Sequence, residues 1–264
     1  MRLTQFVVCI ALAAPQLVDG RQRPVTSYDI NTLSMIAVND NIRIKKVMGE
    51  IGTFMIGDFT AGWKSTPHHH THDQINVGIS GRFNIVTPPA PYVVARLRGL
   101  LIPPDVQHGN DVTGEPVNPV LIEFQPVRRV DFPPEREKVS FPRAASPNPP
   151  AEDLTLDFTR DSRAWERLPN GARANTRKGT AAAVTAWELP GSSSEAIELR
   201  RALVASEQFV YVFDGEGEAM SGGDRLAAAG GTLLVGAAGA PAIRMRARGA
   251  APVVVLVFEA TKPQ

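Results

Sequence analysis

The 264-residue chain has almost no cysteine and no extended block of charge of one sign. Its single cysteine, Cys9, lies in the apolar opening stretch, so a chain without that stretch has neither a disulfide nor a thiol. There are 28 Lys and Arg against 27 Asp and Glu, and no run of like charge is long enough to attract nucleic acid. We therefore expect no nucleic-acid partner.

The sequence also lacks an apolar run long enough to cross a bilayer as a helix. Its most apolar N-terminal stretch is the nine-residue segment from Phe6 to Ala14, which follows Arg2 and ends in small residues. This pattern is typical of a secretory signal peptide and is too short for a membrane span. We predict a signal peptide or a disordered N-terminus over residues 1–20. Cleavage would leave a periplasmic or secreted chain without a membrane span, and without cleavage we expect a cytoplasmic protein.

Sustained amphipathic helical patterns are scarce, and what the sequence has is short β-branched runs separated by Gly, Pro, Asn and Asp. Runs of this length and spacing predict an all-β sandwich or barrel. Residues 133–150 hold six prolines, which excludes a central strand or a helix interior there. We predict a Pro-rich linker over 133–154 between two barrels at 24–132 and 155–262.

Internal repetition supports this division. Residues 72–86 and 206–220 each contain an acid, a Gln, an alternating apolar strand, a Gly and a second strand. Residues 100–112 and 233–245 form a second similar pair. A repeat of this length indicates that each copy is a complete barrel.

The most unusual feature is a group of histidines in the first copy. The chain has five His, and four of them, His68, His69, His70 and His72, lie within five positions. Alternate side chains of a strand share a face, so His68 and His70 can point at one centre while His69 points the other way. The alternatives for the group are a metal site and a solvated turn. His72 sits where the chain turns, either at the rim of a pocket or on the surface.

Two residues farther along the chain extend this pattern. A reversal near Asp73 would let the next strand present Gln74 to the same centre, and His108 follows a Pro-rich turn. Three imidazoles and an amide oxygen suit one borderline divalent ion such as Fe, Mn, Ni, Cu or Zn. Without a carboxylate ligand, the ion would keep its full charge and favour an anionic or chelating substrate.

Four other polar residues are candidates for the same pocket. Asn76 follows Gln74 by two residues and shares its face, so it can bond to a ligand or substrate or serve a structural role. Glu123 is the acid inside an apolar strand and is a candidate general base if it points inward. Arg96 and Arg98 share a face of the strand that leads to His108, where they either recognise an anion or lie on a solvated outer face.

The spacing of these residues resembles the two sequence motifs of the cupin superfamily, over essentially both copies. The first motif places His68 and His70 between two glycines, with Gln74 where Glu is usual. The second motif is matched by "IPPDVQHGN", in which Asp105 replaces the usual Gly and His108 is the third histidine. The resemblance implies two tandem jelly-roll barrels, with a metal held in the first by the following four residues: His68, His70, Gln74 and His108.

The same spacing carried into the second copy implies a barrel without metal. Gln208 stands where Gln74 stands, but Ala202, Val204 and Pro241 take the histidine positions, and none of them binds a metal. We expect this barrel to pack against the first, to support a homodimer or to hold an apolar ligand.

These patterns leave two classes of function open. The first is a metal-dependent enzyme acting on a small oxygen-rich molecule, either a dioxygenase or a non-redox lyase or isomerase. The second is a non-catalytic bicupin that binds a small molecule or is structural. The orientation of Glu123 separates them, because an inward carboxylate provides a proton-transfer group and an outward one does not.

Overall fold

The computed structural model describes residues 17–18, 21–22, 25–87, 90–128, 151–191, 195–199 and 201–262. The regular secondary structure of this part of the chain consists of strands, apart from a 3₁₀ turn η1 (Ile30–Thr32) and a one-turn helix α1 (Ala151–Leu154). The all-β prediction is confirmed. Among the described residues, no helix has the length and apolar content that crossing a membrane requires.

Most of the predicted signal peptide and of the predicted linker lies outside the described residues. The exceptions are β1 (Leu17–Val18), which pairs with β2 (Arg21–Gln22), and α1, which occupies the last four positions of the linker 133–154. Leu154 of α1 is buried in a hydrophobic cluster, and this burial holds the turn of helix against the first barrel.

The first barrel consists of a seven-stranded sheet in the order β13-β10-β7-β12-β6-β5-β4 and a three-stranded sheet in the order β11-β8-β9. Its strands in chain order are β4 (Ile36–Asn39), β5 (Ile42–Met48), β6 (Thr53–Phe59), β7 (Gln74–Ser80), β8 (Phe83–Thr87), β9 (Ala90–Val94), β10 (Arg98–Ile102), β11 (Gly109–Asp111) and β12 (Val120–Gln125).

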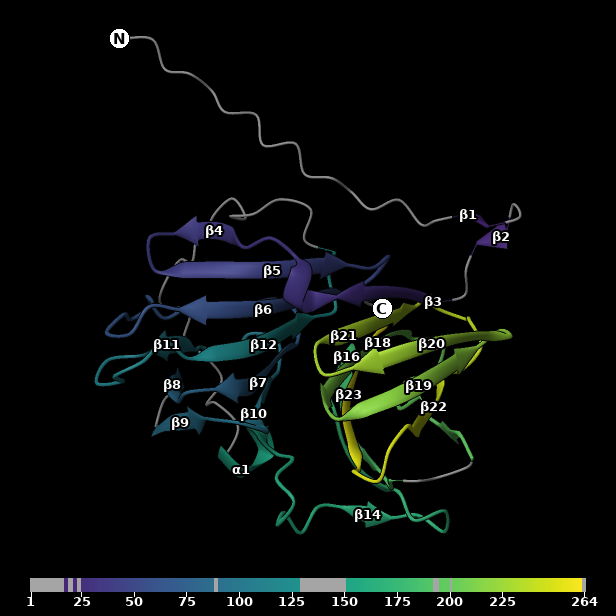
Figure 1. The fold of residues 1–264 in the computed structure, drawn as a ribbon. Helices are drawn as coiled ribbons and strands as arrows, with labels where there is room; N and C mark the ends of the chain where they lie inside the picture. The colour runs from purple at the N-terminus through teal and green to yellow at the C-terminus, as the bar shows by residue number, and fades with distance from the viewer. Residues whose placement is uncertain are drawn as a thin grey trace, which may run out of the picture.

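The second barrel repeats this plan with the sheets β14-β15-β16-β23-β18-β21-β3 and β17-β22-β19-β20. Its strands are β14 (Glu166–Arg167), β15 (Arg173–Lys178), β16 (Ala182–Leu189), β17 (Ile197–Glu198), β18 (Glu207–Asp214), β19 (Glu216–Ser221), β20 (Asp224–Ala229), β21 (Thr232–Gly236), β22 (Arg244–Ala247) and β23 (Val253–Ala260). Figure 1 shows the two barrels side by side.

The barrels exchange their first strands, which the sequence did not predict. β3 (Val25–Asp29) pairs with β21 of the second barrel (Figure 1). β13 (Thr155–Asp157) pairs with β10 of the first barrel. An edge strand leaves backbone N–H and C=O groups unpaired, and an added strand satisfies them. β3 therefore lies in the predicted first segment, 24–132, but in a sheet of the second barrel. β13 lies in the predicted second segment, 155–262, but in a sheet of the first barrel.

Alternation along the strands produces separate cores. On β7, Ile75 and Val77 belong to an inter-barrel core that also contains Phe209 and Phe258 of the second barrel. Their neighbours Gln74 and Asn76 face the opposite way, opposite Ile102 and Leu100 of β10 in the inner core of the first barrel. In this part of β7 the side chains on the inner face are therefore polar, and those on the outer face are apolar. This polar face positions the candidate site.

Aromatic rings fill the inter-barrel core. Phe124 of β12 lies with its ring centroid 5.2 Å from that of Phe209 and 5.3 Å from that of Phe258. Phe54 is 5.7 Å from Phe258 in an edge-on arrangement. Full burial of such a side chain contributes about 1.5–3 kcal/mol to stability. The outer faces of the two large sheets are therefore held together mainly by apolar burial.

Candidate metal centre

Backbone hydrogen bonds bring the histidine segment and the later Pro-rich turn together. His68 and His108 form an antiparallel pair, with both N–H···O distances at 2.7 Å. The N–H of Asp105 donates to the carbonyl of His70 at 2.7 Å. Asp105 has a φ of +62°, in the left-handed region that Gly and Asp tolerate best, and this explains the usual Gly at that position. The two motifs thus meet through the backbone before any side-chain contact is considered.

The side chains of three predicted ligands converge. Ring nitrogens of His68, His70 and His108 all lie within 4.8 Å of one another. Their ring centroids are separated by 4.5 Å for His68 and His108, 5.0 Å for His68 and His70, and 5.2 Å for His70 and His108. Three imidazoles at this spacing surround a point that a single metal ion can occupy.

Hydrogen bonds fix the tautomers of two of these rings. Nδ1 of His68 lies 3.0 Å from the carbonyl oxygen of Thr66, and Nδ1 of His108 lies 2.9 Å from that of Val106. A carbonyl only accepts, so each Nδ1 carries the proton and each Nε2 presents a lone pair. This arrangement of a ring N–H bonded to a backbone carbonyl is common among histidines that bind metals.

His108 provides the clearest sign that the site fits a metal. The residue is 1% exposed, and its Nε2 has no hydrogen-bond partner among the described residues. Burial, with the nearby His68 ring as the second cause, lowers the pKa of His108 to about 3. The ring is therefore neutral at pH 7, and a buried lone pair without a partner requires an explanation. A metal ion at the centre of the three rings supplies one.

Gln74 is buried and is held by Gln125, which also contacts His72. The Nε2 of Gln125 donates to Oε1 of Gln74 at 3.0 Å and to Oε1 of Glu123 at 2.7 Å. The Oε1 of Gln125 lies 3.2 Å from Nε2 of His72. An amide oxygen has two lone pairs, so Gln74 can accept this bond and still offer a lone pair to a metal.

Gln125 was not predicted from the sequence, although it joins three of the predicted residues. One signal was available: it follows Glu123 by two residues and so shares its face of the strand. His72 therefore contacts the polar network inside the barrel, which corresponds to the pocket alternative for this residue. Its ring also stacks on that of His70 at 5.2 Å.

The register of β7 and β12 determines where Glu123 points. Glu123 lies directly opposite Asn76, on the inner face that Gln74 shares. The same cross-strand row continues through Met55 of β6 to Lys46 of β5. Asn76 is 1% exposed, and neither atom of its amide has a hydrogen-bond partner among the described residues. The inner face of the sheet therefore carries acidic, basic and amide groups along this row.

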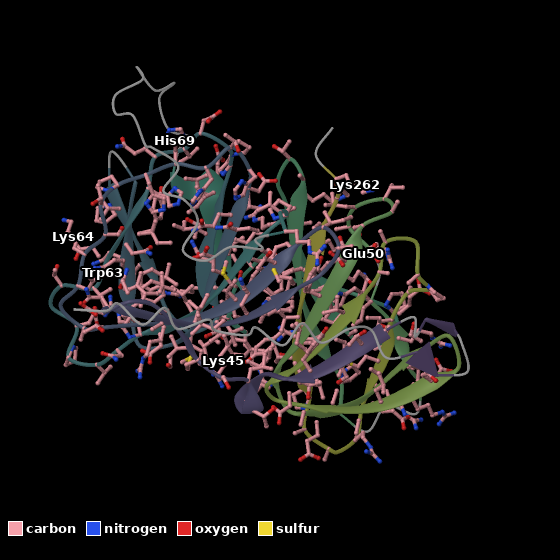
Figure 2. The ribbon with its side chains drawn as sticks, turned by 90° about the horizontal axis from the view of Figure 1, so that it is seen from above. Lys45, Glu50, Trp63, Lys64, His69 and Lys262 are labelled. Atoms are coloured by element: carbon pink, nitrogen blue, oxygen red, sulfur yellow. The ribbon has the colours of Figure 1, made fainter. Side chains whose placement is uncertain are left out.

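His69 lies outside the group of three, as its strand parity predicts. Its Nδ1 is 3.5 Å from Oδ1 of Asp105, and its side chain is about one-third exposed. Figure 2 shows His69 at the edge of the first barrel, away from Trp63 and Lys64.

Arg96 and Arg98 were predicted to share one face of a strand, but Arg96 lies outside the strands. They flank Leu97, whose φ of +59° marks a tight turn between β9 and β10. Arg96 pairs with Asp214 of the second barrel at 3.1 Å, and Arg98 pairs with Asp157 at 3.7 Å. Both side chains are more than half exposed, which corresponds to the outer-face alternative.

The second barrel places a carboxylate where the first has Gln125. Glu259 lies opposite Gln208 and accepts a hydrogen bond from its amide at 3.3 Å, whereas Gln125 donates to Gln74. The Oε2 of Glu259 accepts hydrogen bonds from the N–H groups of Ala202 at 2.6 Å and Leu203 at 3.0 Å. Burial raises the pKa of Glu259, although these two N–H groups act in the opposite direction.

The positions that align with the metal ligands are unsuited to a metal in this barrel. Val204 is 92% exposed, and Pro241 is also at the surface. Within the described residues, the group formed by His68, His70 and His108 is the one cluster of His, Cys, Asp or Glu that could hold a metal. Glu259 instead binds the loop amides at the place where the first barrel presents histidines.

Comparison with known proteins supports the fold. No protein-family model matches the sequence, and no curated protein matches it. Several solved structures are similar over most of the chain at low identity. Protein Ylba from E. coli has a TM-score of 0.65 at 10% identity, covering 96% of each chain. Oxalate decarboxylase from Lactobacillus farciminis, solved with formate, has a TM-score of 0.64 at 8% identity, covering 90% of this chain and 86% of its own.

A salicylate 1,2-dioxygenase variant from Pseudoaminobacter salicylatoxidans has a TM-score of 0.62 at 13% identity, covering 82% of this chain and 75% of its own. By their names, these structures include a decarboxylase and a dioxygenase. Structural similarity at sequence identities this low indicates a shared fold and does not indicate a shared activity. The chain therefore has the tandem jelly-roll fold of the cupins.

Proposed function

We propose that the protein binds one divalent transition metal ion through Nε2 of His68, His70 and His108, with Oε1 of Gln74 as a fourth ligand. The observation that carries this proposal is the buried Nε2 of His108, which lacks a partner among the described residues and faces two further imidazoles. Neutral imidazole and amide ligands suit Fe, Mn, Ni, Cu or Zn. When bound, such an ion would polarise a substrate oxygen as a Lewis acid.

We infer further that the substrate is a small, anionic, oxygen-rich molecule. The proposed ligand set contains no carboxylate, so nothing in it offsets the charge of the ion. The interior row beyond the ligands adds the basic Lys46 and the amide of Asn76. A carboxylate with a neighbouring hydroxyl or carbonyl oxygen matches these groups, because it is anionic, chelates, and accepts or donates hydrogen bonds.

The chemistry that the inner face supports best is proton transfer, as in a lyase or isomerase. Glu123 faces inward, and the N–H of Gln125 holds its carboxylate from one side. Asn76 can donate to and accept from the same substrate. Among similar folds, one structure is a decarboxylase and another is a dioxygenase, so the fold does not choose between reaction types. The inward carboxylate favours the acid–base alternative.

Metal analysis tests the first part of the proposal. Untagged protein, purified without a metal column, should contain one equivalent of a single metal. A His68→Ala/His108→Ala double variant should contain none, while His69→Ala, a matched control from the same segment, should keep its metal. A substoichiometric metal mixture that is unchanged in the double variant would leave a non-catalytic binding or structural bicupin.

Deuterium exchange tests the second part. Small 2-hydroxy and 2-oxo carboxylic acids are incubated with the metal-loaded protein in D₂O and followed by proton NMR. For at least one member of the set we expect loss of a C–H proton signal, from C2 of a 2-hydroxy acid or from C3 of a 2-oxo acid. Glu123→Gln should keep the metal and abolish the exchange. Exchange that persists in Glu123→Gln would remove Glu123 as the base, and oxygen uptake without exchange would favour a dioxygenase.

A further inference from the structure

Two buried carboxylates join the barrels, and they stand at equivalent places. Asp73 immediately precedes β7 in the first barrel and is fully buried. Its Oδ2 accepts hydrogen bonds from the backbone N–H groups of Ala181 at 2.6 Å and Ala182 at 2.9 Å. Ala181 ends the turn between β15 and β16 of the second barrel, and Ala182 is the first residue of β16. A carboxylate of one barrel thus binds a turn of the other.

The second barrel makes the same contact in the opposite direction. Glu207 begins β18, and its carboxylate accepts from the N–H groups of Glu50 at 2.7 Å, Ile51 at 2.9 Å and Gly52 at 2.9 Å. These residues form the turn between β5 and β6 of the first barrel, and Glu50 lies beside the strands of the second barrel in Figure 2. The acid in each copy of the sequence repeat is therefore an inter-barrel contact.

Each turn has a glycine that makes room for its carboxylate. A Cβ added at Gly179 would lie 2.7 Å from the carboxyl carbon of Asp73. A Cβ added at Gly49 would lie 2.2 Å from Oε1 of Glu207. Neither glycine has a positive φ, so the space for the carboxylate, and not the backbone conformation, explains the glycine. We call each carboxylate with its turn a clamp.

The first clamp lies directly behind the proposed metal site. Side chains alternate along the chain, so Asp73 points toward the second barrel while His72 and Gln74 point inward. Both inward side chains contact Gln125. The segment is therefore fixed on its inner side by Gln125 and on its outer side by a turn of the second barrel.

The second clamp has the same arrangement without a metal site. Ser206 and Gln208 flank Glu207, and both donate to Oε1 of Glu259, at 3.2 and 3.3 Å. No histidine lies on this side. The first clamp thus lies behind the proposed metal site, and the second lies behind a region without histidines. The second clamp therefore serves as a control for the first.

We propose that Asp73 is a positioning residue for the metal site, and that the second barrel supports the site in the first by binding the Asp73 carboxylate. This inference rests on the proposed function. Asp73 touches no predicted ligand atom, and its effect passes through the backbone to Gln74 and His72. Groups that orient metal ligands typically change metal affinity by about 10–100-fold when they are lost.

The test compares two matched pairs of variants. Asp73→Ala and Glu207→Ala each remove one carboxylate, and Gly179→Ala and Gly49→Ala each push a methyl group into one clamp from the opposite barrel. Cobalt(II) affinity is measured by competition with a chromophoric chelator, and thermal unfolding of the metal-free protein reports stability. We expect Asp73→Ala and Gly179→Ala to weaken cobalt binding at least about tenfold, and the Glu207 and Gly49 variants by less than about threefold.

Stability is expected to separate from affinity. Glu207 accepts three backbone hydrogen bonds and Asp73 accepts two, so Glu207→Ala should lower the unfolding temperature at least as much as Asp73→Ala. Equal loss of cobalt affinity in both pairs, or none in the first pair, would overturn the positioning role. If Asp73→Ala does not fold, the comparison of cobalt affinity between Gly179→Ala and Gly49→Ala tests the positioning role. Wild-type protein that binds no cobalt would overturn the proposed function and this inference together.

Discussion

Replacing Gln125 with Leu should destabilise the first barrel and weaken metal binding, because this one side chain links three residues of the proposed site. Leu has a similar volume and cannot make hydrogen bonds. The substitution removes the contacts from Gln125 to Oε1 of Gln74 at 3.0 Å, to Oε1 of Glu123 at 2.7 Å and to Nε2 of His72 at 3.2 Å. It leaves an acceptor on buried Gln74 that the surrounding apolar core does not satisfy.

The size of the effect follows from the type of each bond. Two neutral hydrogen bonds at about 1 kcal/mol each and one to a carboxylate at about 2 kcal/mol sum to about 4 kcal/mol. Glu123 is only partly buried, so water recovers part of the loss at its carboxylate. We expect a decrease of about 3 kcal/mol in the free energy of unfolding. Gln74 also loses the bond that orients its oxygen, so metal affinity should fall by about 10–100-fold.

Urea unfolding of the metal-free protein measures the first quantity. With a slope of about 2–3 kcal/mol per molar urea, the midpoint should fall by about 1 M. Gln125→Glu is the matched control: it keeps an acceptor for His72 but loses the two amide donations, and it places a carboxylate beside Glu123. It should destabilise more at pH 8 than at pH 5. A Leu variant with the wild-type midpoint and wild-type metal affinity would refute the reasoning.

Two further predictions concern other parts of the molecule. Burial lowers the pKa of His108 to about 3 in the folded state, against about 6.5 in an unfolded chain. Between about pH 3 and pH 6.5 the unfolded state therefore binds one proton more than the folded state, and protonation favours unfolding. The metal-free protein should therefore lose about 2 kcal/mol between pH 7 and pH 5, and urea unfolding of His108→Gln at both values should show that this part of the loss is absent. Phe124→Ala should cost about 3–5 kcal/mol, because the ring packs between Phe209 and Phe258. Calorimetry should show the whole unfolding transition moving to lower temperature, whereas an unchanged second-barrel transition would mean that the barrels unfold independently.

The sequence by itself determined the fold class and most of the proposed metal site. Alternating apolar residues specify strands, because successive side chains of a strand point to opposite faces. The spacing of His68 and His70 places two imidazoles on one face, and it is a local property of the chain. The loss of ligands in the second copy is also local, since Ala202 and Val204 stand where those histidines would be.

The tertiary structure alone decided how the remaining polar residues are used. Glu123 faces inward because β12 pairs with β7 in a particular register, and a shift of one residue would turn it outward. Gln125 joins the site through the same pairing. The acid in each sequence repeat was visible, but its partner is a turn more than 100 residues away in the chain. The sequence shows residue types and local periodicity, whereas strand register and barrel contact depend on the burial of both barrels together.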